Sequence, residues 1–188
     1  MTLILSKKYN PLFDSKARYF IITGGRGSGK SFAVTVFLTL LTMSRGIRVL
    51  FTRFTMTSAH LSIIPEFLEK IGLLGFDETF NINKAEVVNA KNKSDILFRG
   101  IRTSAGNQTA SLKSLQGIST WCLDEAEELV DENIFDTIDL SIREKDIQNR
   151  IILILNPVTK EHWIYKRFFE DKGVEGGFNG VKDNVCYI

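Results

Sequence analysis

Residues 22–34, ITGGRGSGKSFAV, place four glycines just before a lysine and a serine. Gly24, Gly29, Lys30 and Ser31 match G-x-x-x-x-G-K-[ST], a loop whose backbone N–H groups surround phosphate oxygens. Glycine suits this loop because it adopts positive φ angles and lets the backbone approach an anion. The lysine of such a loop binds the β- and γ-phosphates, and the serine hydroxyl binds Mg²⁺. The segment therefore predicts a site for ATP and Mg²⁺ that is formed by Gly24, Gly25, Arg26, Gly27, Ser28, Gly29, Lys30 and Ser31.

Two acidic residues, Asp124 and Glu125, end the apolar strand predicted by TWCL. Ligands bind at the carboxyl ends of parallel strands. With a phosphate loop in the same chain, Asp124 is expected to hold Mg²⁺, which prefers oxygen ligands, and Glu125 to activate the attacking water. The alternative is that DEAEE caps a helix, because acids favour helix N-termini. We expect Glu127 and Glu128 in such a cap or on the surface.

Two further polar residues are candidates for contact with the transferred phosphoryl group. Asn156 follows the apolar run RIILIL, where it can reach the γ-phosphate, although Asn-Pro is also a frequent turn. Arg26 lies inside the glycine loop, where a guanidinium can stabilise the charge that develops on the phosphoryl oxygens. Alternatively, Arg26 points outward to an acid or to DNA.

The phosphate loop must lie between a strand and a helix to work. Residues 18–23, RYFIIT, form an aromatic and β-branched run that is typical of a buried strand. Residues 31–44 are apolar on nearly all sides, which predicts a buried helix. Further strands are predicted at 46–54, early in 118–130, at 150–157 and at 177–188, and further helices at 58–75, 131–144 and 160–171.

Alternating strands and helices predict an α/β fold, a mainly parallel sheet with helices on both faces. Residues 79–100 predict a small antiparallel hairpin insertion, and residues 102–117 a polar loop. We expect an extra strand, residues 48–53, between the phosphate-loop strand and the acidic strand. Together with the glutamate beside the metal aspartate, this resembles the additional-strand, catalytic-glutamate class of P-loop nucleotidases, which includes helicases, ring ATPases and packaging motors.

Composition sets broad limits on the kind of protein. A chain of 188 residues with 44% apolar and 24% charged residues is expected to form one globular domain. The net charge of +2 is too small to indicate nucleic-acid binding by itself. Cys122 and Cys186 indicate a reducing compartment without a disulfide framework. We expect no signal peptide, because MTLILSKKYN contains only a four-residue apolar patch, and no membrane partner, because no apolar run reaches about 18 residues.

Four segments in order resemble the ATPase half of the large terminase subunit of tailed bacteriophages. They are GGRGSGKS, VLFTRFTMTSAHLSIIPEFLEKIGL, ILFRGIRTSAGNQTASLKSLQGISTWCLDEAEEL and SIREKDIQNRIILILNPVTKEHWIYKRFF. The resemblance extends from about Tyr9 to near the end of the chain. Its specific parts are the loop arginine, Arg26, and the patterns FRG…LKSLQG…DEAEEL and NP…W.YKRFF. In similar terminases an arginine in this loop is proposed to sense or stabilise the phosphate.

This resemblance implies a motor that packages viral double-stranded DNA into a procapsid. Such subunits form a homo-oligomeric ring on the portal protein, work with the small terminase subunit, and act in the host cell cytoplasm while docked on the procapsid. A C-terminal nuclease domain of the family cuts the DNA concatemer. We expect residues 1–188 to be the P-loop ATPase domain alone, without that nuclease domain.

The resemblance also indicates residues for two further tasks. A ring ATPase needs a positive group from the neighbouring subunit, and Arg102, Lys113 and Arg143 are candidates, although such residues are more often solvated surface charges. Tyr9, Asn10 and Phe13, in YNPLF, resemble the adenine-side segment of the family. There the Tyr9 ring either stacks on the base or anchors the core.

The sequence leaves two alternative functions to be considered. A helicase-type, nucleic-acid-dependent ATPase would normally carry Ser-Ala-Thr after the strand that here ends in Asn-Pro. A nucleotide-gated assembly module with little turnover would not need both Lys30 and Glu125.

Overall fold

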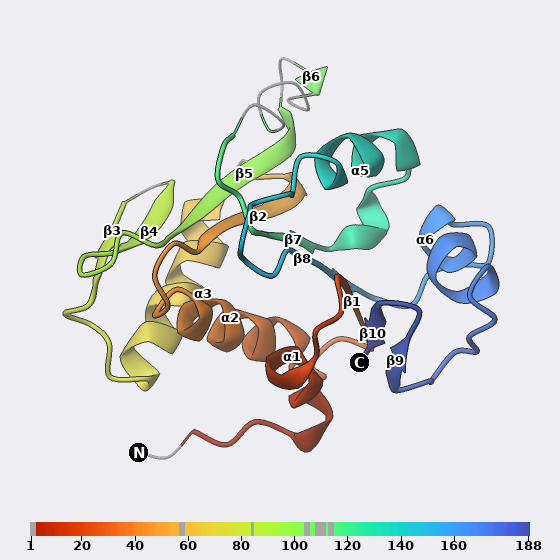
Figure 1. Ribbon diagram of the computed structural model, residues 1–188, viewed down its shortest axis with the longest axis horizontal. Coiled ribbons are helices and arrows are strands. Elements are labelled where there is room, and N and C mark those ends of the chain that lie inside the picture. The colour runs from red at the N-terminus through yellow and green to blue at the C-terminus, as the bar shows by residue number, and fades with distance from the viewer. Residues whose placement is uncertain (1–2, 57–58, 84, 104–105, 108–111, 113–114) are drawn as a thin grey trace.

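The computed structural model describes residues 3–56, 59–83, 85–103, 106–107, 112 and 115–188. Within these residues a ten-stranded sheet has the order β3-β4-β5-β2-β7-β8-β1-β10-β9, with β6 paired to β5 (Figure 1). The strands are β1 (Tyr19–Thr23), β2 (Arg48–Thr55), β3 (Phe80–Ile82), β4 (Glu86–Asn89), β5 (Asp95–Thr103), β6 (Gly106–Asn107), β7 (Thr120–Asp124), β8 (Arg150–Leu155), β9 (Gly180–Lys182) and β10 (Val185–Tyr187).

The central strands, from β5 through β2, β7, β8 and β1 to β10, all run parallel. The α/β fold with a mainly parallel sheet is therefore confirmed. The antiparallel insertion is present as β3 and β4. β5, whose residues 95–100 fall within the predicted insertion, instead joins the main sheet alongside β2. The last segment, predicted as one strand, forms the antiparallel pair β9 and β10.

The expected position of the strand at 48–53 is wrong. β8 lies between the phosphate-loop strand β1 and the acidic strand β7, and β2 lies on the far side of β7. The physical reason is that β8 is apolar and buried from Ile151 to Leu155, which suits a central strand covered on both faces. β2 ends instead in three residues that are not buried, Arg53, Phe54 and Thr55. Asn156, which follows β8, is thereby placed between the phosphate loop and the acids.

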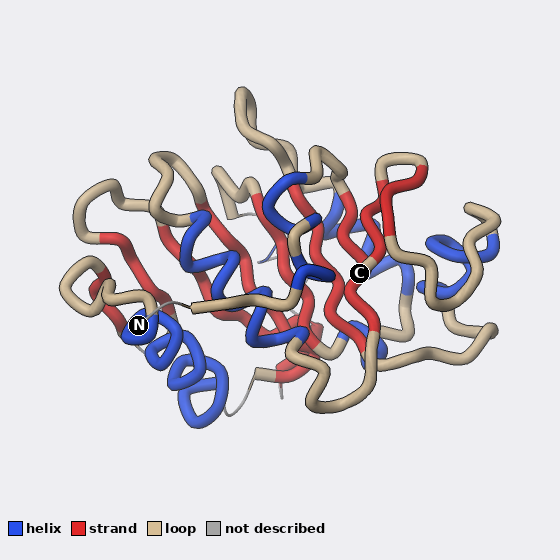
Figure 2. Tube along the Cα trace, turned by 90° about the horizontal axis from the view of Figure 1, so that it is seen from below, coloured by secondary structure: helices blue, strands red, loops and turns tan. Residues whose placement is uncertain are grey.

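Helices cover both faces of the sheet (Figure 1 and Figure 2). On one face lie α1 (Pro11–Asp14), α2 (Lys30–Leu41) and α3 (Ala59–Leu73), and on the other α5 (Glu132–Asp139), α6 (Trp163–Tyr165) and the π-helix η3 (Lys166–Glu170). Alternation along the strands supplies both cores: Phe20 and Ile22 pack on the first face, and Ile21 on the second. Two short 3₁₀ helices, η1 (Lys7–Tyr9) and η2 (Ala126–Glu128), flank the strand ends.

The helices are shorter than their apolar patterns predict. The helix expected at 131–144 ends at Asp139, and Asp131 caps its start by accepting a hydrogen bond of 3.0 Å from the Asn133 N–H. The segment at 160–171 contains only α6 and the π-helix η3. None of the described helices has the length and apolar character that crossing a membrane requires.

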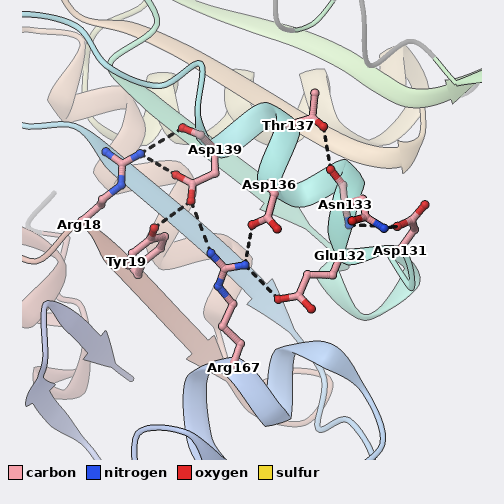
Figure 3. Close-up of polar contacts among 9 residues, drawn as sticks. All are labelled: Arg18, Tyr19, Asp131, Glu132, Asn133, Asp136, Thr137, Asp139 and Arg167. Carbon is pink, nitrogen blue, oxygen red and sulfur yellow. Dashed lines mark hydrogen bonds and ion pairs between the residues drawn. The ribbon is translucent and has the colours of Figure 1, made fainter.

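A polar network connects helix α5 and the π-helix η3 to the start of β1 (Figure 3). The buried Asp139 carboxylate accepts hydrogen bonds from Arg18 Nη2 at 2.6 Å and from the Tyr19 hydroxyl at 2.8 Å. Arg167 of η3 pairs with Asp136 at 2.6 Å, and its Nη2 lies 3.9 Å from Asp139 Oδ2. Asp139 of α5 is therefore the acceptor shared by the start of β1 and the π-helix η3.

We expect Asp139→Ala to lower the free energy of unfolding by about 3 kcal/mol, because half-buried Arg18 and Tyr19 lose their common acceptor. The control Asp136→Ala removes a more exposed carboxylate from the same helix and should cost no more than about 1 kcal/mol. Denaturant titration of both variants measures the difference. Equal, small losses would show that the network contributes little to the fold.

Candidate active site

The phosphate loop lies directly between β1 and the first turn of helix α2. Gly27 and Gly29 have φ angles of 75° and 85°, a left-handed conformation that favours glycine. Gly29 is the N-cap of α2, and Lys30 is its first residue. The loop's N–H groups and the positive end of the helix dipole therefore act on the same region, as phosphate binding requires.

A cavity of about 340 Å³ opens at the carboxyl ends of β1, β7 and β8. The residues that line it are Arg26, Gly27, Ser28, Gly29, Lys30, Ser31, Phe32, Arg53, Asp124, Glu125, Glu127, Ile154, Leu155 and Asn156. The structure thus brings the predicted loop, acids and asparagine to one place, although they lie far apart in the sequence. The volume is within the usual range for a small-molecule site.

Lys30 lines this cavity and is held by the backbone of the loop. Its side-chain amine donates hydrogen bonds to the carbonyl oxygens of Gly24 and, at 3.0 Å, Gly25. The same nitrogen lies 3.5 Å from Asn156 Oδ1 and 3.4 Å from Ser28 Oγ. Gly24 and Gly25 therefore hold the lysine through their backbone, while the following loop residues line the cavity.

Burial and neighbouring charges shift the pKa of Lys30 in opposite directions. Only 9% of its surface is exposed. Burial lowers the pKa of Lys30, and the negative charges of Glu127 and Asp124 oppose that shift. A lysine in this setting gains strongly from an anionic phosphate because few water molecules compete for it.

Asp124 and Glu125 have different surroundings at the end of β7. Asp124 is buried, with 4% of its surface exposed, whereas Glu125 is only partly buried. Glu125 also has a backbone φ of 54°, a left-handed conformation that is rare for a residue other than glycine. This left-handed turn ends the strand and places Glu125 at the cavity wall. Burial raises the pKa of the Glu125 carboxyl, with the Arg53 guanidinium opposing, so Glu125 is a stronger proton acceptor than a free carboxylate.

Arg53 is a residue of the site that sequence reasoning missed. Its Nε and Nη2 lie 2.8 Å and 2.6 Å from Asp124 Oδ2, and its Nε lies 3.7 Å from Glu125 Oε2. A Mg²⁺ ion at Asp124 would therefore share this carboxylate with Arg53. The available signal was a lone charge near the carboxyl end of β2, inside the run VLFTRF.

The expectation that Glu127 belongs to a cap or to the surface is wrong. Its carboxylate lines the cavity, and its Oε1 accepts a hydrogen bond of 2.6 Å from Asn156 Nδ2. The physical reason is that Glu125–Glu128 form a tight 3₁₀ turn, which returns Glu127 toward the end of β8. Glu128 of the same turn is exposed.

Oxygen ligands for Mg²⁺ are available in the cavity. The Ser31 hydroxyl and the Asp124 carboxylate both line it, and this hard-donor set fits the ion. The described residues include no cluster of three or more His, Cys, Asp or Glu side chains suited to a metal. Mg²⁺ would therefore complete its shell with phosphate oxygens and water, as it usually does.

Tyr9 and Asn10 lie beside the loop in different environments. Tyr9 is 3% exposed and belongs to the core, and its hydroxyl donates a hydrogen bond of 2.9 Å to the Ser28 carbonyl oxygen. The Lys8 side-chain amine donates to the same oxygen at 3.2 Å. Asn10 is exposed at the start of α1 and does not line the cavity. The segment thus supports the loop from the core through Tyr9.

The candidate arginines for a neighbouring site lie at opposite edges of the sheet. Arg102 is exposed near the carboxyl end of β5, the same edge as the cavity because β5 is parallel to β2. Arg143 lies beside Gly117 and Ile118, which precede β7, so it lies at the amino edge. Lys113 lies outside the described residues.

Comparison with known proteins agrees with this geometry. A family model described as phage terminase large subunit matches residues 16–188. No curated protein gives a significant match. The large terminase of a thermophilic bacteriophage is similar in structure, with a TM-score of 0.73 and 13% identity, over 99% of this chain and 45% of the thermophilic phage protein.

Two other phage proteins share the fold. The HK97 bacteriophage large terminase has a TM-score of 0.68 and 11% identity, over 96% of this chain and 40% of its own. The N-terminal domain of the DNA packaging ATPase from bacteriophage phi29 has a TM-score of 0.70 and 16% identity, over 97% of this chain and 95% of the phi29 domain. This chain spans less than half the length of the thermophilic phage and HK97 proteins. Since the family model covers nearly the whole sequence, the chain belongs to the phage terminase large subunit family.

Proposed function

We propose that this chain is the ATPase domain of a large terminase and hydrolyses ATP to drive viral double-stranded DNA into a procapsid. The observation that carries the proposal is the single cavity that unites Lys30, the acid pair and Asn156. Solved structures of the thermophilic phage large terminase in complex with ADP and with ATP-gamma-S support nucleotide binding in this fold. The phi29 relative is described as a DNA packaging ATPase, and another similar structure as a DNA packaging motor.

In this proposal each part of the cavity has one task. The loop N–H groups and Lys30 bind the β- and γ-phosphates and orient the γ-phosphoryl group. Ser31 and Asp124 hold Mg²⁺, which neutralises charge on the phosphate oxygens when bound. Glu125 orients the attacking water and accepts its proton as the new P–O bond forms and ADP leaves.

Two further residues act on the same phosphoryl group. Asn156 lies beside Lys30, within reach of the γ-phosphate end of a bound nucleotide. Arg26 is exposed on the cavity wall, where its guanidinium can stabilise charge on the phosphoryl oxygens.

The intact protein acts in an assembly. We propose a homo-oligomeric ring on the portal protein that works with the small terminase subunit in the host cell cytoplasm. Residues 1–188 supply the ATPase domain, and cutting of the packaged DNA belongs to the nuclease domain of the family. Arg102 is the favoured arginine for the neighbouring subunit's site, because it lies at the carboxyl edge of the sheet with the cavity.

A mixing experiment tests both the activity and the shared site. Glu125→Gln subunits lack the base but keep Arg102, and Arg102→Ala subunits keep a complete cavity. Mixing the two in portal-bound motors should restore phosphate release, because a finger arginine contributes about 10³–10⁵ in rate. The isolated domain should hydrolyse ATP slowly, with specific activity that rises with protein concentration.

Arg143→Ala is the matched control, since it removes an exposed arginine at the opposite edge, and it should stay active without mixing. Full activity of Arg102→Ala motors would contradict the role of Arg102 and favour Arg26 acting within its own subunit. If wild-type motors release no phosphate, the protein is not an ATPase but a nucleotide-gated assembly module.

A further inference from the structure

We infer that Glu127 is a positioning residue of the ATPase reaction, which fixes the orientation of the Asn156 side-chain amide. The inference deepens the proposed function and rests on it. It begins with three side chains in a row: Lys30 Nζ lies 3.5 Å from Asn156 Oδ1, and Asn156 Nδ2 donates to Glu127 Oε1 at 2.6 Å.

Only one orientation of the Asn156 amide satisfies both neighbours. An ionised glutamate accepts hydrogen bonds without donating, and a lysine ammonium donates without accepting. An asparagine amide has one donating end and one accepting end. Glu127 therefore takes the NH₂ end, and the carbonyl oxygen of Asn156 faces Lys30 and the phosphate loop.

Glu127 is itself held in place by the segment that begins helix α6. His162 Nε2 lies 3.1 Å from the Glu127 carbonyl oxygen, while His162 Nδ1 accepts from the Ile164 N–H at 3.2 Å. This pair of contacts requires the neutral histidine with its proton on Nε2, which then donates to Glu127. The Trp163 indole N–H donates to the Leu129 carbonyl oxygen at 2.5 Å, so the C-terminal side of the turn is anchored at two points.

Fold stability alone does not account for a carboxylate at this position. The second oxygen, Glu127 Oε2, is buried and has no hydrogen-bond partner within the described part of the chain. A buried acceptor without a partner is unfavourable for folding. Such local costs are characteristic of functional sites, where they are retained for the geometry they impose.

The consequence for the reaction follows from the position of Asn156 between β1 and β7. With its carbonyl oxygen turned into the cavity, Asn156 can accept a hydrogen bond from the attacking water and help to aim it at the γ-phosphorus. If Glu127 is removed, the amide can rotate and donate to a phosphate oxygen of bound ATP instead. That change leaves the attacking water without its acceptor and adds at most one weak contact to bound ATP, so kcat should fall while ATP affinity changes little.

The kinetic test compares three variants of the full chain in single-turnover ATP hydrolysis. Glu127→Ala should reduce the rate about tenfold or more, with ATP affinity within about threefold of wild type. Glu127→Gln should keep most of the rate, because its side-chain carbonyl still accepts from Asn156. Glu128→Ala, an exposed neighbour in the same turn, is the matched control and should behave as wild type.

A double-mutant cycle separates positioning from a general structural effect. Because Glu127 acts through Asn156, Glu127→Ala should cost nothing further in an Asn156→Ala background. Additive losses, or a Glu127→Gln variant as slow as Glu127→Ala, would overturn the inference. A wild-type chain that hydrolyses no ATP would instead overturn the proposed function.

A second measurement does not depend on turnover. In ¹H–¹⁵N spectra the Asn156 NH₂ resonance is identified by its loss in Asn156→Ala. Its hydrogen exchange should be slow in wild type, in Glu127→Gln and in Glu128→Ala, and faster in Glu127→Ala. An Asn156 resonance that Glu127→Ala leaves unchanged in shift and exchange would show that Glu127 does not hold the amide.

Discussion

Lys30→Ala should weaken ATP binding about 100-fold or more, because two charge-assisted hydrogen bonds to phosphate are lost and each contributes about 1.5–3 kcal/mol. No other loop residue can replace this charge from the same position. Arg26 is exposed on the cavity wall, whereas Lys30 is buried at the first turn of α2. Isothermal titration calorimetry with a non-hydrolysable ATP analogue measures the loss.

The matched control for Lys30→Ala is Lys8→Ala. Lys8 contacts the same loop, at the Ser28 carbonyl oxygen, but from its outer side and with an exposed side chain. Its removal should change ATP affinity only a few-fold, since the loop N–H groups and Lys30 remain. Circular dichroism checks that both variants fold. Wild-type affinity in a folded Lys30→Ala protein would refute the phosphate-loop assignment.

Glu125→Gln should leave ATP binding intact and reduce hydrolysis about 10²-fold or more, because the amide keeps the shape of the side chain but cannot accept the proton of water. Burial raises the pKa of the Glu125 carboxyl, which makes its ionised form a stronger base for this step. Phosphate release under saturating ATP, with binding measured separately, divides the effect between kcat and affinity.

Glu128→Gln controls for the loss of one negative charge from the same acidic run and should keep wild-type hydrolysis. Normal turnover by Glu125→Gln would transfer the role of base to another carboxylate of the cavity. Glu127 would then be the first candidate, and Glu127→Gln would become the inactive variant. Comparing Glu125→Gln with Glu127→Gln therefore shows in one experiment which glutamate is the base and which is the positioning residue.

The parts of the site that could be predicted from the sequence are those formed by short continuous segments of the chain. The spacing from Gly24 to Ser31 specifies a loop conformation on its own, and the apolar run before Asp124 fixes that residue at a strand end. The fold class followed in the same way, since buried parallel strands are apolar throughout. These features depend on local chemistry and on the general rule that ligands bind at carboxyl ends of strands.

The parts that escaped prediction depend on which strands become neighbours. Arg53 reaches Asp124 only because β2 pairs with β7. Asn156 is a predicted site residue, but its place beside Lys30 depends on β8 lying between β1 and β7, a strand order that the sequence did not predict. Strand order is set by the packing of all the helices, which no short segment encodes. Glu127 was missed for a related reason, because a left-handed residue at Glu125 redirects the turn.

The most direct test of the account is a crystal structure of this chain with Mg²⁺ and a non-hydrolysable ATP analogue. We expect the β- and γ-phosphates within the loop and in contact with Lys30, the Mg²⁺ ion at Ser31 and Asp124, and the γ-phosphate facing Glu125 and Asn156. A nucleotide bound elsewhere, or one whose γ-phosphate points away from Glu125, would contradict the assignment of this cavity as the ATPase site.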